Sequence, residues 1–159
     1  LAVRPKDSVV AIVGDHGFER VDRDLNIPIF AKQIDAVGKI ATFGGLLSTE
    51  DSNVAGRMRA SGLLGREVPK QEILRFVPEA TQVVAAFEPK RNEGFWNGRP
   101  DQPLHIPPYE KGNHGWWPGL SDYRAAFLLE GPGVKAGKSP EMPMEAAAGL
   151  FAGILKIKL

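Results

Sequence analysis

The sequence contains no cysteine, and this absence excludes both a disulfide framework and a thiolate metal site. Any metal ion must then be held by carboxylates, imidazoles, hydroxyls or backbone oxygens. No apolar run approaches the roughly 18 residues that a membrane span needs, and no basic start followed by an apolar run marks a signal peptide. The compartment in which the protein works is therefore not written in its sequence.

The chain also lacks an excess of charge of either sign. Its 20 Lys and Arg residues against 19 Asp and Glu residues give a formal net charge of +1. This balance argues against a nucleic-acid-binding surface, which needs clustered basic residues. Glycine and proline are plentiful, at 18 and 13 of the 159 residues, and predict many turns and long ordered loops.

The apolar pattern predicts strands that alternate with helices, which is typical of an α/β layered fold. We expect a first strand over residues 8–13, buried on both faces in a parallel sheet. A helix should follow, with Asn26 near its start and Gly44-Gly45 after its end. The later patterns predict a short helix at 69–77, strands at 81–87 and 123–129 and a closing helix at 143–155. Residues 46–113 are expected to form an insertion or long-loop region.

Residues 14–18, Gly-Asp-His-Gly-Phe, follow the first predicted strand. In an open α/β sheet, ligands bind outside the carboxyl ends of the strands. Asp15 and His16 are residue types that bind zinc, so this segment is a candidate metal site. The alternative is a turn whose Asp and His side chains face water.

A second histidine, His114, ends a long proline-rich loop over residues 89–113. Loops of this length in compact domains are usually functional or disordered. Like His16, His114 precedes a glycine, which would let the backbone approach a metal or substrate closely. Trp116 and Trp117 would then form a wall of the site. The alternative is that His114 packs within its loop and the two tryptophans are core or interface residues.

The third histidine, His105, lies in the same loop without neighbours that form a ligand pattern. We expect it to pack or to lie at the surface.

The segments 14–18 and 112–133 together resemble the carboxy-terminal part of a nucleotide pyrophosphatase/phosphodiesterase of the alkaline phosphatase superfamily. The family pattern is a strand ending in Ser-Asp-His-Gly-Met, then a His-Gly-Tyr segment, then a strand ending in Gly-Pro-Gly. Here Gly14 stands in place of the serine and Trp116 in place of the tyrosine.

The resemblance implies part of a doubly wound, mostly parallel sheet with helices on both faces. It also implies that residues 1–159 form a single domain, the carboxy-terminal part of a larger catalytic domain. The superfamily allows an extracytoplasmic location.

The resemblance implies roles for particular residues. Asp15 and His16 match a pair that binds one of two zinc ions, and His114 matches a ligand of the other. The nucleophile and the remaining ligands are expected in a missing amino-terminal half of the same protein, so no residue of this chain is assigned as catalytic. Trp116 and Trp117 are assigned to substrate binding. The chain alone is expected to be inactive.

The implied activity is metal-dependent hydrolysis of phosphoric esters, either phosphodiesters or nucleotide pyrophosphates. The substrate would be a small phosphate ester or a nucleotide. A phosphomonoesterase, a phosphonate hydrolase and a phosphomutase are alternatives within the superfamily. A different class of function is a non-catalytic domain that keeps the fold and only binds a ligand or partner.

Overall fold

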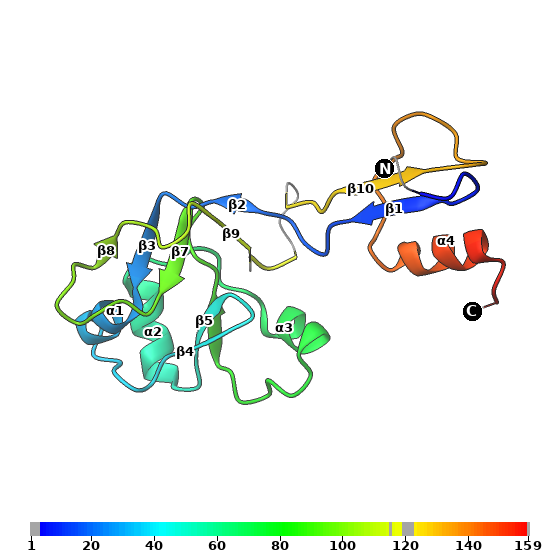
Figure 1. Ribbon diagram of the computed structural model, residues 1–159. Helices are drawn as coiled ribbons and strands as arrows, with labels where there is room; N and C mark the ends of the chain where they lie inside the picture. The colour runs from blue at the N-terminus through cyan, green and yellow to red at the C-terminus, as the bar shows by residue number, and fades with distance from the viewer. Residues whose placement is uncertain (1–3, 115, 119–122, 159) are drawn as a thin grey trace. The chain divides into compact units, whose positions relative to one another are not determined.

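The computed structural model describes residues 4–114, 116–118 and 123–158. The contacts between residues divide the chain into two compact units, which are described separately below (Figure 1). The terminal unit consists of residues 1–11 and 129–159, and the central unit of residues 12–128. All the candidate site residues named above belong to the central unit.

The central unit contains short strands and three helices in its described part. In chain order the elements are β2 (Glu19–Arg20), β3 (Arg23–Asn26), α1 (Ile27–Gln33), β4 (Ala41–Phe43), β5 (Leu46–Thr49), α2 (Ser52–Ala60), α3 (Lys70–Phe76), β6 (Ala85–Phe87), β7 (Glu93–Trp96), β8 (His105–Ile106) and β9 (Gly112–Asn113). Strand β1 (Val10–Val13) pairs with β10 (Phe127–Glu130), and both cross the boundary between the units.

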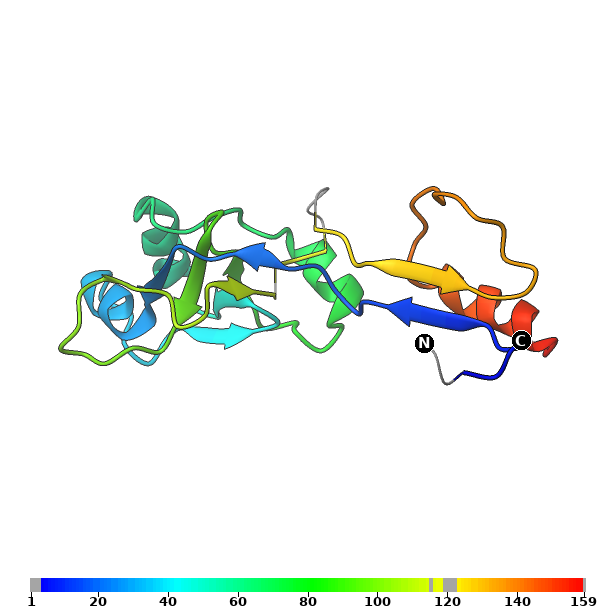
Figure 2. The same ribbon diagram turned by 45° about the horizontal axis from the view of Figure 1, so that its top comes forward.

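Three small sheets organise the central unit (Figures 1 and 2). In the first, β3 lies between β7, to which it is parallel, and β8, to which it is antiparallel. In the second, β5 lies between β4 and β6, and both pairs are antiparallel. Strands β2 and β9 form a third, antiparallel pair. The order β7-β3-β8 joins segments about 70 and 80 residues apart in the chain.

Strand β5 separates two hydrophobic clusters. Leu47 belongs to a cluster with residues of β3, α1 and α2, whereas Leu46 belongs to a second cluster that includes Ile73 and Trp117. Successive side chains of a strand point to opposite faces, so neighbouring residues of β5 enter different clusters. Both leucines are fully buried.

The terminal unit contains helix α4 (Ala146–Leu155) and parts of β1 and β10. Ala147 and Ala152 are the buried residues of α4. Arg4 donates to the Glu130 carboxylate at 2.6 Å. No helix in the described residues is long and apolar enough to cross a membrane.

The predicted doubly wound, mostly parallel sheet is wrong. The described strands form several short antiparallel or mixed sheets, and β3–β7 is the parallel pair among the registers that the structure gives. The doubly wound sheet was implied by the family resemblance, and the parallel sheet also by a first strand buried on both faces, but Ile12 is 56% and Val13 40% exposed. The run of valine and isoleucine does form a strand, β1, but the prediction that both of its faces are buried is wrong. The single-domain organisation and the insertion at 46–113 stay predictions.

The helix expected after Asn26 is shorter than the apolar pattern predicted: α1 ends at Gln33, well before Gly44 and Gly45. Asp35 and Gly38 adopt positive φ angles of 52° and 73°, a left-handed conformation that ends α1. Asn26 lies at the N-cap position without a side-chain capping hydrogen bond, and its Nδ2 donates to the backbone carbonyls of Arg99 and Pro103. Beyond the helix, the chain continues as β4.

Candidate functional site

Strands β2 and β9 bring the two glycine-flanked histidines together. Glu19 lies opposite Asn113 and Arg20 opposite Gly112. Because the pair is antiparallel, the residues before Glu19 run alongside the residues after Asn113. His16 and His114 therefore meet, although 98 positions (114 − 16) separate them in the sequence.

The two imidazole rings are stacked. Their centroids lie 4.2 Å apart and their planes differ by 15°. The ring of Phe18 completes a three-ring cluster, 6.3 Å from His16 and 6.2 Å from His114. A Cβ atom on Gly112 would lie 2.9 Å from Cε1 of Phe18, so the glycine of β9 makes room for the cluster.

The hydrogen bond of His16 determines which nitrogen is free to bind a metal. Nδ1 lies 2.9 Å from the carbonyl oxygen of Gly17, and a carbonyl only accepts, so Nδ1 carries the proton. In the neutral imidazole, Nε2 is then the nitrogen with the lone pair. A hydrogen bond of this kind, from the second ring nitrogen to a backbone carbonyl, is typical of metal-binding histidines.

Asp15 lies beside that free nitrogen. Its Oδ1 is 3.4 Å from Nε2 of His16. Two ligands of one tetrahedral zinc ion, each about 2.0–2.1 Å from the metal, are separated by about 3.3 Å. The distance between Asp15 and His16 therefore fits two ligands of one ion. Among the described residues, however, no group of three His, Asp or Glu side chains is arranged to hold a metal.

Gly17 is required for packing. A Cβ atom at this position would lie 2.8 Å from Cδ2 of Tyr123. The sequence predicted that the glycine admits a metal or substrate; the group that approaches it here is the tyrosine ring. The corresponding glycine after His114 lies outside the described residues.

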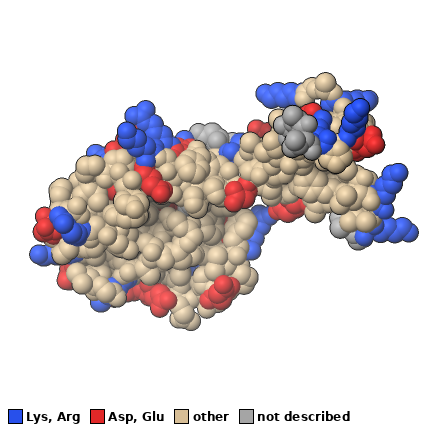
Figure 3. Space-filling model, viewed as in Figure 1, with Lys and Arg blue, Asp and Glu red and all other residues tan. Residues whose placement is uncertain are grey.

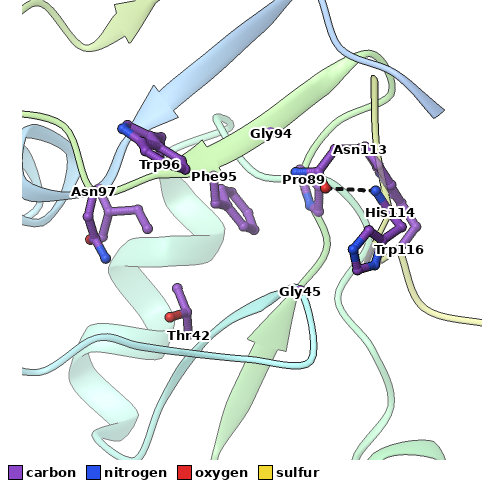
Figure 4. A pocket seen from close by; sticks show the side chains of 11 residues that line it. Thr42, Gly45, Pro89, Gly94, Phe95, Trp96, Asn97, Asn113, His114 and Trp116 are labelled. Atoms are coloured by element: carbon purple, nitrogen blue, oxygen red, sulfur yellow. Dashed lines mark hydrogen bonds between the residues drawn. The ribbon is translucent and has the colours of Figure 1, made fainter. Parts of the chain in front are cut away.

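A cavity of about 300 Å³ lies next to His114 (Figure 4). Phe95 and Trp96 from β7 line it, and Thr42 from β4 lines it as well. Trp116 also lines this cavity and is 5% exposed. Trp117, assigned with it to substrate binding, does not line the cavity. It packs in the second hydrophobic cluster, edge-on to Phe76 at 5.5 Å.

An ion pair between a buried carboxylate and an exposed arginine holds the segment that carries His114 and Trp116. The carboxylate of Glu88, which is 2% exposed, accepts from the backbone N–H of Trp117 at 3.1 Å. Arg66 donates to the same carboxylate at 2.9 Å and to Glu72 at 3.1 Å. These two carboxylates raise the pKa of the Arg66 guanidinium.

Glu88 was not among the residues predicted from the sequence. A carboxylate directly after the apolar run at 83–87 was the available signal.

A stacked aromatic pair lies at the edge of the cavity. The rings of Trp96 and Tyr109 are 4.1 Å apart with planes that differ by 11°. The buried carboxylate of Asp24 accepts from the backbone N–H of Tyr109 at 2.8 Å and so anchors the segment that supplies the second ring. The sequence analysis named neither ring.

His105 occupies a different place from the other two histidines. It lies in β8 opposite Leu25, half-buried, with Nε2 4.0 Å from a carboxylate oxygen of Glu93. This position agrees with the packing or surface role expected from the sequence.

Comparisons with protein-family models, with curated proteins and with solved structures find no match for this chain.

Proposed function

We propose that Asp15, His16 and His114 contribute to a site for two divalent metal ions, zinc by preference, at which the parent protein hydrolyses phosphoric esters. The observation that carries the proposal is the stacking of the two imidazoles at 4.2 Å. Paired catalytic metals lie about 3.5–4 Å apart, so two nearly parallel rings at this spacing suit one ligand for each ion. Asp15 and His16 would hold one ion, and His114 the other.

Each part of the chain has a defined task in this proposal. Bound metal ions would supply charge stabilisation at phosphorus. The Gly17 carbonyl fixes the His16 ring and its tautomer, and Phe18 supports both rings. Glu88 positions the His114 segment through Trp117. The nucleophile and the remaining ligands are assigned to a preceding part of the same protein, as the family resemblance implies.

A non-catalytic binding domain is the second candidate. The lack of a three-ligand group among the described residues favours it. The two candidates differ in the coding sequence upstream of Leu1: an Asp motif, a Ser or Thr nucleophile and an Asp-x-x-x-His pair there support the enzyme, and their absence supports the binding domain.

Zinc titration of the chain tests the metal assignment. Because the chain has three histidines, ¹⁵N spectra of the imidazoles can follow each of them. We expect weak binding that shifts the Nε2 signal of His16 and a ring nitrogen of His114, with His105 unchanged as the internal control. Shifts confined to His105, or tight binding of two ions by this chain alone, would contradict the proposed ligand set.

A further inference from the structure

The described residues that line the cavity beside His114 are largely aromatic. Phe95, Trp96 and Trp116 supply aromatic surface, and among the described lining residues none is Asp, Glu, Lys or Arg. Burying a charged group against the aromatic part of this lining would cost free energy, because no Asp, Glu, Lys or Arg among the described lining residues compensates the charge. The cavity therefore favours a neutral occupant.

The surface supports the same conclusion. Figure 3 shows a hollow on the central unit that is free of charged side chains, with acidic and basic residues around it. The volume of about 300 Å³ is at the lower end of the range for small-molecule pockets. An occupant of one or two rings fits this volume better than a long chain or a peptide.

Two polar side chains lie at one side of the cavity. Figure 4 shows Thr42 below the Phe95 ring and Asn97 to the left of that ring. Neither side chain has a hydrogen-bond partner within the described part of the chain, which leaves the Thr42 hydroxyl and the Asn97 amide free for a ligand. A few polar groups set among aromatic walls are typical of a site that orients a flat ligand.

We propose that this cavity binds a neutral, planar ring that carries a hydrogen-bonding edge. The ring would lie against Phe95, with its polar edge toward Thr42 and Asn97. Since His114 lines the same cavity, the ring would be the organic half of the phosphoric ester. That last step rests on the proposed function; the binding of the ring itself does not.

Titration with benzamide, a neutral planar ring with a carboxamide edge, tests the proposal without metal or phosphate. We expect saturable shifts of the indole N–H signals of Trp96 and Trp116, which line the cavity. Trp117 does not line the cavity, so its indole N–H signal should not shift. Cyclohexanecarboxamide, which is not planar, and benzylammonium, which is charged, should each bind about tenfold more weakly, a difference of about 1.4 kcal/mol.

A matched pair of variants tests the polar edge. Thr42→Val removes the hydroxyl and keeps the shape and strand preference of the side chain, so benzamide should bind several-fold more weakly. Thr81→Val makes the same change at an exposed position away from the cavity and should leave binding unchanged.

The proposal is overturned if benzamide shifts neither Trp96 nor Trp116, if the three probes bind equally, or if Thr42→Val and Thr81→Val behave alike. Because zinc is absent, this failure would leave the metal assignment standing. Likewise, a failure of the histidine titration would leave the ring site standing.

Discussion

Glu88 and Trp117 are joined by a hydrogen bond of 3.1 Å from a backbone N–H to a buried carboxylate. Through this contact the end of β6 fixes the segment whose His114 and Trp116 both line the cavity. The chemistry proposed for the site thus depends on an ion pair that touches neither the metal ligands nor the cavity.

Glu88→Gln tests this dependence. Glutamine keeps the shape and accepts from the Trp117 N–H, but it leaves Arg66 without its buried carboxylate partner. We expect the free energy of unfolding to fall by about 1–3 kcal/mol, measured by urea denaturation, and the Trp117 amide signal to shift. Glu79→Gln, at an exposed position, is the control. Equal stability of the two variants would show that the Glu88 pair does not hold the segment.

Gly17→Ala tests the close contact beside His16. The added Cβ would lie 2.8 Å from the Tyr123 ring and 3.0 Å from its backbone carbonyl carbon, so one of the two segments must move. We expect a loss of about 1–3 kcal/mol in stability and weaker ring-current shifts between His16 and His114. Gly56→Ala is the matched control: nothing lies within 4 Å of its Cβ position in α2, so stability should rise by about 0.5–1 kcal/mol. A loss at Gly56 or a gain at Gly17 would contradict this assignment.

Asp24 gives the stability a dependence on pH. Burial raises the pKa of its carboxyl above the ordinary 3.8, and the charge of Glu110 adds to the effect, whereas the Tyr109 N–H lowers it. The folded protein therefore binds a proton more tightly than the unfolded chain does. Stability from this group is greatest below pH 3.8 and is lost as the pH rises through the raised folded pKa.

Asp24→Asn should remove this pH dependence, because asparagine keeps an oxygen for the Tyr109 N–H and does not ionise. The dependence of the free energy of unfolding on pH is measured by urea denaturation between about pH 3 and pH 7, in steps of about half a pH unit. Asp7→Asn, at an exposed position, should retain the wild-type slope. An unchanged slope in Asp24→Asn would rule out Asp24 as its source.

If the nucleophile and the remaining metal ligands lie in a preceding part of the protein, this chain alone should not hydrolyse a chromogenic phosphodiester. Positioning of an oxygen nucleophile supplies much of the rate of such reactions, and no Ser or Thr adjoins Asp15 and His16 in the sequence. In a longer protein with the upstream motifs, Asp15→Asn and His114→Ala should each remove most activity, whereas His105→Ala should change it little. Zinc-dependent turnover by the chain alone is the contrary result.

Local patterns predicted some elements well. The proline at position 69 and the apolar spacing after it predicted a helix at 69–77, and α3 spans Lys70–Phe76. The closing helix predicted at 143–155 is confirmed as α4, Ala146–Leu155. The sequence also placed His16 and His114 in one site, and their rings are stacked. Their role as metal ligands stays a prediction.

Long-range pairing could not be predicted from these patterns. Strand β3 lies between β7 and β8, and its own residues, Arg-Asp-Leu-Asn, carry no alternating apolar signal. Asp24 and Asn26 are buried there with hydrogen-bond partners far along the chain: the Asp24 carboxylate accepts from the Tyr109 N–H, and Nδ2 of Asn26 donates to the Arg99 carbonyl. The cavity has the same origin, since Thr42 and Phe95 meet only once both sheets have formed.

The two-residue turn at Gly44 and Gly45 has a consequence for the ring site. Both glycines have positive φ angles, 52° and 78°, as a tight hairpin between β4 and β5 requires. This turn fixes Thr42 opposite Leu47. Inserting one residue there would shift the pairing by one and reverse the faces of β4 relative to β5. The hydroxyl of Thr42 would then leave the cavity, so the length of a turn that binds nothing determines what the cavity can recognise.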